Sequence, residues 1–289
     1  MTFATPKGTQ FVRLLGGGSV FQVGLVCAQG REIVCKRLAP HALETREGRA
    51  AMMREAKLLS IIEHDALPKL VGVGHDAHGP FFLETYVPGT SLRELRRGWS
   101  AKEKPIPESL ARHIVVTSLE TLAELHELAD DDGPLGIVHG DISPDHVYFG
   151  PLGDVSFVDL GAARFRGLDP EAETNDRGTV PYAAPEVVRG EDKPRQGTDV
   201  YALCATLVWF ASGEQLCETS TDAAMLAEVA SRGVRRDLVD RVRAFERLQR
   251  ECFRAALDPD PASRPSSARQ LLDAFAPTSR RRDIPGEAR

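Results

Sequence analysis

The residue types best suited to chemistry gather in residues 137–147, where an apolar pair leads into His139-Gly140-Asp141. A second aspartate, Asp159, follows a short distance downstream within the sequence Val-Asp-Leu-Gly. Residues typical of β-strands flank each aspartate, so both carboxylates are expected on neighbouring loops. One carboxylate can orient a hydroxyl group and the other can hold a divalent metal, which is a combination suited to phosphoryl transfer. A single His-x-Asp motif is a weak signal, because a solvated loop aspartate is the more common case.

Upstream, a glycine-rich turn and a lysine lie in a region that alternates in the manner of β-strands. Residues 10–36 predict a three-strand meander whose first turn contains Gly16, Gly18 and, three positions later, Phe21. Glycine lets backbone N–H groups approach a phosphate closely, because no Cβ stands in the way. The pattern alone favours a phosphate-covering loop and a plain glycine-rich hairpin about equally. Lys36 would bring an ammonium group to the same cleft, although most lysines on strands are simply solvated.

A helix is predicted over residues 45–63, where apolar residues recur at spacings of three and four. Glu55 stands at the border of the apolar face of this helix. It either faces solvent, as most helical glutamates do, or forms an ion pair that aims Lys36 at phosphate groups. Two further strands are predicted over residues 69–74 and 81–87. Helical patterns cover four later segments, residues 107–127, 223–231, 237–257 and 267–275.

Composition limits the class of protein. The chain has 289 residues, 42% of them hydrophobic, and a net charge of −6, which suits a two-lobed globular unit and argues against nucleic-acid binding. Its five cysteines form no C-x-x-C pair, as expected for reduced thiols in a cytoplasmic protein. The N-terminus lacks the apolar run of a signal peptide, and the longest apolar run, residues 200–211, is too short to span a membrane.

Several motifs together resemble one known family in their order and spacing. They are the glycine turn, Val34-Cys35-Lys36, Glu55, the linker at 85–92, His139-Gly140-Asp141, Asp159-Leu160-Gly161, the segment 178–186 ending in Ala-Pro-Glu, Asp199, and Arg264. The family is that of the eukaryotic-type Ser/Thr protein kinases in the form found in bacteria. The resemblance covers residues 10–276 and implies an α+β, two-lobed fold, with a small antiparallel β-sheet lobe plus one helix and a larger, mostly helical lobe.

The resemblance also implies an organisation and a set of site residues. The expected parts are an N-terminal tail (1–9), an ATP-binding lobe (10–88), a catalytic and substrate-binding lobe (89–276) and a disordered tail (277–289). The implied catalytic residues are Asp141, Lys36, Glu55 and Ser143, with Asp141 taking the proton of the acceptor hydroxyl. The implied nucleotide-binding residues are Leu15, Gly16, Gly17, Gly18, Ser19, Val23, Val34, Lys36, Thr85, Val87 and Asp159. The implied metal ligands are Asp159 and His146, the structural residues are His139, Glu186, Asp199 and Arg264, and the candidate phosphorylation sites are Thr174 and Thr179.

ATP with Mg²⁺ or Mn²⁺ would be the cofactors and a protein the substrate, without nucleic acid or a membrane span. The catalytic loop is degenerate, because His146 stands where the family has an Asn that binds the second metal, and imidazole suits Mn²⁺ better than Mg²⁺. Ser143 replaces a lysine of the loop. Gly140 replaces the Arg that reads a phosphorylated activation loop, so activation through such a pair is not expected. The back wall of the adenine pocket is either Glu84 or, after a slip of one residue, Leu83.

Three functions remain open from the sequence. The charged residues of the implied site favour an active Ser/Thr protein kinase. His146 and Phe21 favour a pseudokinase, a nucleotide-binding or scaffolding module with little phosphotransfer. The His-Gly-Asp motif also occurs in kinase-like enzymes that modify antibiotics, but residues 178–186 and Arg264 argue against a small-molecule phosphotransferase because they build a platform for peptide substrates.

Overall fold

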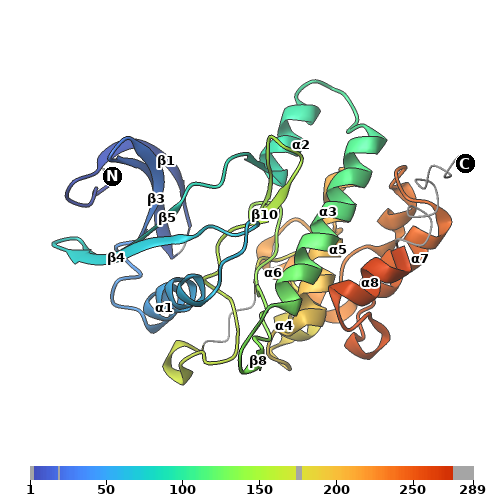
Figure 1. The fold of residues 1–289 in the computed structure, drawn as a ribbon. Helices are drawn as coiled ribbons and strands as arrows, with labels where there is room; N and C mark the ends of the chain where they lie inside the picture. The colour runs from blue at the N-terminus through green and yellow to red at the C-terminus, as the bar shows by residue number, and fades with distance from the viewer. Residues whose placement is uncertain (1–2, 19, 174–177, 276–289) are drawn as a thin grey trace, which may run out of the picture.

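The structure is a computed structural model that describes residues 3–18, 20–173 and 178–275. It confirms the predicted two-lobed α+β fold, with a smaller β-stranded lobe followed by a larger helical one (Figure 1). Five antiparallel strands form the sheet of the small lobe in the order β1-β2-β3-β5-β4. Their bounds are Gln10–Gly17 (β1), Phe21–Ala28 (β2), Arg31–Leu38 (β3), Leu70–Asp76 (β4) and Gly79–Thr85 (β5).

Strand alternation decides which side chains of the sheet reach the space between the lobes. In the pairing of β3 with β5, Val34 lies opposite Glu84 and Cys35 lies opposite Leu83. Successive side chains of a strand point to opposite faces. Cys35 and Leu83 pack around Phe3 on one face of the sheet, whereas Val34 and Glu84 line the cavity between the lobes on the other.

The described part of the segment before β1, the expected N-terminal tail (1–9), packs on the sheet. Phe3 is buried and its ring stacks on that of Phe11 at a centroid distance of 5.8 Å. Gly24 makes room for this ring, since a Cβ there would lie 2.6 Å from Phe3. The carbonyl of Ala4 accepts a hydrogen bond from Arg37 Nε at 2.6 Å, which fixes the segment to β3.

One helix, α1 (Arg46–Ile61), packs against the sheet. Thr45 begins it as the N-cap, because its hydroxyl accepts a hydrogen bond from the Gly48 amide at 3.0 Å. The predicted helix, residues 45–63, is therefore correct to within two residues at each end. Its buried face contains two adjacent charged residues, Arg54 and Glu55.

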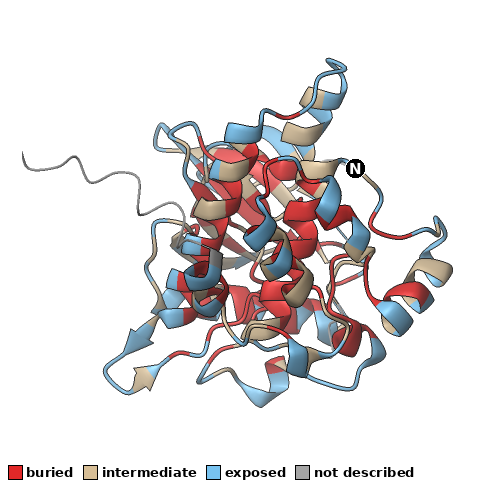
Figure 2. Ribbon diagram, turned by 90° about the vertical axis from the view of Figure 1, so that its right-hand side faces the viewer, coloured by how far each residue is buried: buried red, intermediate tan, exposed pale blue. Residues whose placement is uncertain are grey.

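The large lobe is built around α3 (Glu108–Glu127) and α5 (Gln196–Ser212), and Figure 2 shows buried residues concentrated along its interior helices. The apolar run at 200–211 lies in α5, most of which is buried. The other helices are α2 (Leu92–Ser100), α4 (Pro185–Arg189), α6 (Asp222–Arg232), α7 (Arg247–Ala256) and α8 (Ala268–Phe275), with 3-10 turns η1 (Pro170–Ala172), η2 (Arg236–Arg241) and η3 (Pro261–Ser263). Short strands are β6 (Thr90–Ser91), β7 (Ala129–Asp130), β8 (Gly133–Pro134), β9 (Val147–Phe149) and β10 (Val155–Phe157).

The prediction of one helix over residues 237–257 is wrong, because the chain turns between η2 and α7. The rings of Phe245 and Phe253 lie 4.4 Å apart. Eight residues of a continuous helix would separate them by about 12 Å. Glu246 begins the second helix through a reciprocal capping box with Gln249. Within the described residues, no helix combines the length and the apolar character needed to cross a membrane.

Candidate active site between the lobes

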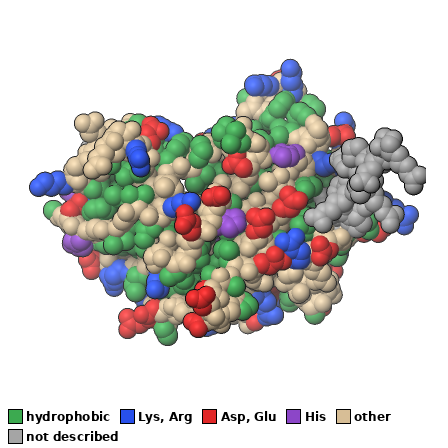
Figure 3. Space-filling view, viewed as in Figure 1, with side chains coloured by type: hydrophobic (Ala, Val, Ile, Leu, Met, Phe, Trp, Pro, Cys, Tyr) green, Lys and Arg blue, Asp and Glu red, His purple; other side chains and the backbone are tan. Residues whose placement is uncertain are grey.

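A cavity of about 520 Å³ lies between the lobes and receives side chains from both. Every sequence-predicted nucleotide-binding residue that the structure describes lines it, whereas Ser19 lies outside the described residues. These lining residues are Leu15, Gly16, Gly17, Gly18, Val23, Val34, Lys36, Thr85, Val87 and Asp159, and His146 joins them. On the face drawn in Figure 3, acidic and basic side chains are interspersed among apolar ones.

The glycine turn forms one wall of this cavity. The Gly18 amide donates to the Phe21 carbonyl at 2.9 Å, which closes the turn between β1 and β2. A Cβ on any of the three glycines, Gly16 to Gly18, would meet no atom within 4 Å, so the turn stands open. Phe21, three positions after Gly18, is buried and packs edge-to-face on Phe82 at a centroid distance of 6.2 Å. Its ring therefore belongs to the core and does not crowd the turn.

Lys36 and Glu55 meet across the sheet and α1, with Nζ 2.6 Å from Oε1. Both side chains are buried, at 5% and 0% exposure. Burial opposes the charged form of Lys36, but Glu55 and then Glu84 outweigh it and raise the pKa of Lys36 far above its ordinary value. Burial raises the pKa of Glu55, and Lys36 opposes this rise. The carboxylate of Glu55 also accepts the Leu160 amide at 3.1 Å, so α1 contacts the chain directly after Asp159.

Glu84, and not Leu83, forms the back wall of the cavity. Its Oε1 lies 3.3 Å from Lys36 Nζ, and its side chain is 4% exposed. Burial, partly offset by Lys36, raises the pKa of Glu84 to about 8. Among the described residues, neither Glu84 Oε2 nor Glu55 Oε2 has a hydrogen-bond partner. The lysine therefore faces two buried carboxyl groups, each of which keeps one oxygen without a partner among the described residues.

The β9–β10 hairpin brings His146 and Asp159 together, because Val147 pairs with Phe157 at the open end of the hairpin. His146 Nε2 lies 3.6 Å from Asp159 Oδ2. On the other side of the ring, Nδ1 lies 2.7 Å from the Asp141 carbonyl and 3.5 Å from Asp141 Oδ2. The imidazole thus stands between the two aspartates that the sequence singled out.

The hydrogen bonds of His146 determine whether its second ring nitrogen, Nε2, carries a proton. A carbonyl only accepts, so Nδ1 must donate to Asp141, and Nε2 then carries a proton only in the charged imidazolium. Burial disfavours that charge, but Asp159 and Asp141 outweigh it and raise the pKa of His146. Burial would raise the pKa of Asp159, yet Lys36 and His146 together lower it. Nε2 and the Asp159 carboxylate accordingly require a proton or another cation between them.

The donor set fits a cation that nucleotide phosphates help to hold. Mg²⁺ is commonly bound by one or two carboxylates together with phosphates and water, rather than by a cage of side chains. Asp159 offers such a carboxylate, 39% exposed, and His146 adds a nitrogen. Within the described part of the chain, no group of three or more His, Cys, Asp or Glu residues is placed to hold a metal. Asp159 has a φ of +64°, an uncommon conformation that is concentrated at functional sites.

Asp199, at the start of α5, holds the loop that carries His139 and Asp141. Its carboxylate accepts the amides of His139 at 2.7 Å and Gly140 at 2.9 Å, and His126 Nε2 lies 3.0 Å away. His139 is buried, which lowers the pKa of its ring, and its Nε2 lies 3.2 Å from the Val158 carbonyl. These bonds join the loop before β9 to the strand that precedes Asp159.

Asp141 faces a second cavity of about 400 Å³, which shares His146 and Asp159 with the first. Its Oδ1 accepts the Thr179 amide at 2.7 Å, which leaves Oδ2 toward His146.

The structure does not bring Ser143 to either cavity. Ser143 is 1% exposed, and its carbonyl accepts the amides of residues 146 and 147, so its backbone shapes the loop. Thr174 lies outside the described residues.

The expected ion pair of Glu186 and Arg264 is present in the large lobe. Arg264 donates to both oxygens of Glu186, at 2.8 and 2.9 Å, and both side chains are buried. Arg264 also donates to the carbonyls of residues 258 and 259, and its guanidinium lies 4.6 Å from the ring centroid of Tyr201. Four of the five N–H donors of its guanidinium group bind these neighbours, which is typical of a structural residue.

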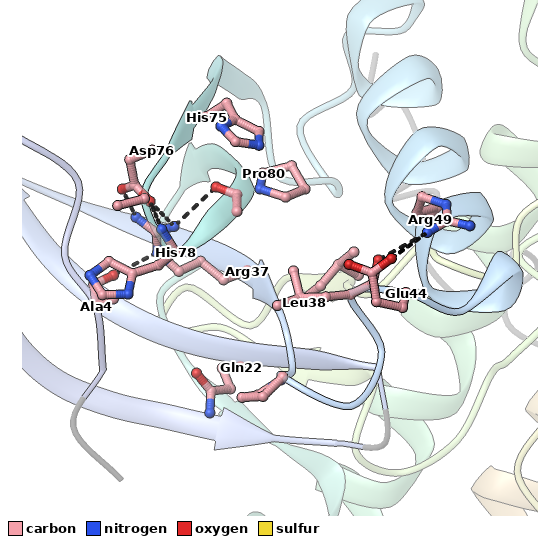
Figure 4. Close-up of a pocket in the computed structure, with 14 residues that line it drawn as sticks. Ala4, Gln22, Arg37, Leu38, Glu44, Arg49, His75, Asp76, His78 and Pro80 are labelled. Atoms are coloured by element: carbon pink, nitrogen blue, oxygen red, sulfur yellow. Dashed lines mark hydrogen bonds and ion pairs between the residues drawn. The ribbon is translucent and has the colours of Figure 1, made fainter.

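Another cavity, of about 760 Å³, lies away from this chemistry, between the β4–β5 turn and the start of α1 (Figure 4). Its one buried cation, Arg37, is paired with Asp76 and donates to the Ala4 carbonyl. The side chains of Arg49 and Glu44 at its other end are exposed and lie 3.9 Å apart. The charges of this cavity therefore already have partners within the small lobe.

Comparison with known families agrees with the geometry. The protein kinase domain model matches residues 9–275. The chain belongs to the protein kinase family. Kinase family membership implies ATP and a divalent metal in general terms, and a protein as substrate.

Relatives of this kinase domain are distant and differ in their names. It is 27% identical over 197 residues to the tyrosine-protein kinase MasK of Myxococcus xanthus, covering 66% of this chain and 30% of that protein. It is 31% identical over 203 residues to the cysteine-rich receptor-like protein kinase 42 of Arabidopsis thaliana, covering 70% and 29%. It is 25% identical over 224 residues to the serine/threonine-protein kinase PknD of Protochlamydia amoebophila, covering 67% and 22%. The alignments thus span less than a third of each relative.

Among the cavity-lining residues that the sequence did not predict, Arg54 makes the most far-reaching contacts. Arg54, directly before Glu55, is 3% exposed and lines the second cavity. It donates to the Gly161 carbonyl at 2.5 Å and to the Ala172 carbonyl at 2.8 Å. In the sequence, only its position beside Glu55 on a helix with a buried face could have indicated a role. A hydrogen bond to a distant backbone carbonyl produces no pattern in a sequence.

Proposed function

We propose that this kinase domain is an ATP-dependent protein serine/threonine kinase. The observation that carries the proposal is the joint placement of the Lys36–Glu55 pair, Asp159 and Asp141 around two cavities that share residues. These groups come from β3, α1 and the two loops beside the β9–β10 hairpin. Their assembly into one cleft is what phosphoryl transfer requires, because that reaction depends mainly on positioning and electrostatics.

The first cavity suits a nucleotide. Thr85 and Val87 would offer a backbone carbonyl and amide to the edge of adenine, while Val23, Val34 and Val158 would cover the faces of the ring. The open glycine turn would lie over the phosphates with no side chain of its three glycines in the way. Lys36, held by Glu55, would neutralise phosphate charge once it turns from Glu84.

The second cavity suits the acceptor hydroxyl. Asp141 Oδ1 is engaged by the Thr179 amide, so Oδ2 would take the hydroxyl proton. Asp159, with His146 beside it, would hold a divalent cation that reduces the negative charge on the phosphates. His139 and Asp199 would position the loop without contacting substrate. Thr179, next to Asp141, remains a candidate site of autophosphorylation, as does Thr174.

Serine and threonine are proposed as acceptors because of the resemblance to bacterial Ser/Thr kinases and the relationship to PknD. The similarity to a protein named as a tyrosine kinase makes tyrosine the alternative acceptor to be tested.

A pseudokinase is the second candidate, and His146 is the observation that favours it. Its ring lies between Asp141 and Asp159, where a charged imidazolium could take the place of a metal. Such a protein would bind nucleotide without transferring phosphate.

Incubation with γ-labelled ATP, a mixed protein substrate and either Mg²⁺ or Mn²⁺ tests the proposal, with phosphoamino-acid analysis of the product. We expect label on serine and threonine that Asp141→Asn abolishes. Nucleotide binding without transfer under both metals would favour the pseudokinase, and label confined to tyrosine would replace the acceptor class.

A further inference from the structure

Two adjacent charged residues of α1, Arg54 and Glu55, are both buried, and they contact the same turn from two sides. Glu55 accepts the Leu160 amide at 3.1 Å. Arg54 donates to the carbonyl of the next residue, Gly161, at 2.5 Å. The small lobe thus binds one donor and one acceptor of the backbone that directly follows Asp159.

Arg54 also reaches further along the chain. Its Nη1 donates to the Ala172 carbonyl in η1 at 2.8 Å. The neighbouring Glu173 is held from the large lobe by Arg164, at 3.0 Å, and by Lys193, at 2.5 Å. The guanidinium therefore joins α1 to two points of the same segment, one beside Asp159 and one where the segment contacts the large lobe.

The two hydrogen bonds of Arg54 matter because the loop that carries Asp141 has no cation at position 140 to bind this segment. Gly140 has no side chain, and a Cβ at that position would lie 2.4 Å from the Ala162 carbonyl, directly after Gly161. The backbone of the two loops is packed too closely there for a side chain without displacement. The buried cation that binds the segment comes from the small lobe instead.

We propose that Arg54 is a positioning residue that couples α1 to the Asp159 turn, so that the Lys36–Glu55 pair and Asp159 are assembled without a phosphorylated residue. This role rests on the proposed kinase function. A guanidinium bonded to two carbonyls of one segment fixes both the distance and the orientation of that segment. Loss of Arg54 would release the turn and leave the nucleotide-contacting surfaces in place.

Substitution of Arg54 by Met and by Lys tests this coupling, with Arg49→Met as the control. Arg49 lies on the same helix, but its side chain is 53% exposed, lies 3.9 Å from Glu44 and donates to the nearby Leu43 carbonyl at 3.1 Å. We expect Arg54→Met to lower the single-turnover rate by about 100-fold, the cost of a misplacement of about 1 Å. Affinity for ADP measured without a divalent metal should change by less than about threefold, since the residues expected to contact adenine, Thr85 and Val87, lie elsewhere in the first cavity. Arg54→Lys keeps the charge and should recover part of the rate, whereas Arg49→Met should match wild type.

Hydrogen exchange gives a readout that does not depend on turnover. In both Arg54 variants, amide exchange should accelerate in peptides covering residues 157–173 and remain unchanged in α5. Unchanged local exchange would overturn the proposal, as would a uniform increase throughout both lobes, which would indicate a role in global stability. If wild type transfers no phosphate, the proposed function fails, but the exchange data still decide the coupling. Rates within twofold of wild type in an active protein would also overturn it.

Discussion

Two buried ion pairs, one in each lobe, differ in how completely their charges are satisfied. In the large lobe, Arg264 binds both oxygens of Glu186 and two backbone carbonyls. In the small lobe, Lys36 faces two carboxylates, Glu55 and Glu84, each of which keeps one oxygen without a hydrogen-bond partner among the described residues. Both oxygens of the large-lobe carboxylate are hydrogen-bonded, whereas Lys36 and Glu84 of the small-lobe cluster line a cavity.

The difference separates a residue that holds the fold from one that is available to a ligand. A buried acceptor without a partner costs free energy, so its retention calls for an explanation. With the proposed function, Lys36 in the small lobe would exchange Glu84 for a phosphate group. Arg264 has no such exchange available, because its hydrogen bonds all serve neighbouring residues of the large lobe.

Lys36→Met should produce the largest effect and confine it to activity. We expect phosphoryl transfer to fall by about 100- to 1,000-fold, the range typical of losing one preorganised electrostatic group. Glu55 should then take up a proton and Glu84 should keep its own, because burial already raises the pKa of each, and the fold should survive. Single-turnover rates and far-UV circular dichroism would measure both outcomes. Lys57→Met, an exposed position on α1, is the control, and a rate near wild type for Lys36→Met would refute the site.

Arg264→Ala should produce the largest loss of stability. It leaves Glu186 as an unpaired buried charge, which costs about 3–5 kcal/mol. The matched control is Arg269→Ala, since Arg269 binds both oxygens of Glu127 at 2.8 and 2.9 Å but is 39% exposed. Exposed pairs contribute about 1 kcal/mol or less. Equal free energies of unfolding for the two variants, measured in urea, would contradict the distinction between buried and exposed pairs.

His146→Asn should change activity moderately. An amide oxygen suits Mg²⁺ better than an imidazole nitrogen, so we expect the Mg²⁺-supported rate to rise by about tenfold and ATP affinity to remain nearly constant. Wild type should transfer faster with Mn²⁺ than with Mg²⁺. Identical Mg²⁺-supported rates for the two proteins would mean that the second ligand position contributes little.

Glu84→Gln should remove a pH dependence, the smallest of these effects. The folded protein holds the Glu84 proton up to about pH 8, whereas the unfolded chain releases it near the ordinary value of 4.5. The native state therefore binds more protons than the unfolded state between these values, and stability must fall as pH rises. Melting temperatures measured from pH 5 to 8.5 should decline more steeply in wild type than in Glu84→Gln. Parallel curves would show that Glu84 is ionised throughout.

The fold was predictable because its signals are local or ordered along the chain. Periodicity predicted α1 and the strands, and the motif order predicted both lobes. The choice between Glu84 and Leu83 depended on the register between β3 and β5, which a single sequence does not specify. Arg54 escaped prediction because its partners are carbonyls more than a hundred residues away. Ser143 was expected at the site, but it is buried and lines neither cavity.

The central claim is that the small-lobe pair serves the nucleotide and the large-lobe pair serves the fold. The most direct test is the rise in melting temperature on adding Mg²⁺ with a non-hydrolysable ATP analogue to wild type, Lys36→Met and Arg264→Lys. A ligand at about 100 times its dissociation constant stabilises the native state by about 2.7 kcal/mol. We predict a rise of similar size in wild type and in Arg264→Lys, from a lower starting temperature in the latter, and little rise in Lys36→Met. An equal rise in Lys36→Met, or none in wild type, would contradict the claim.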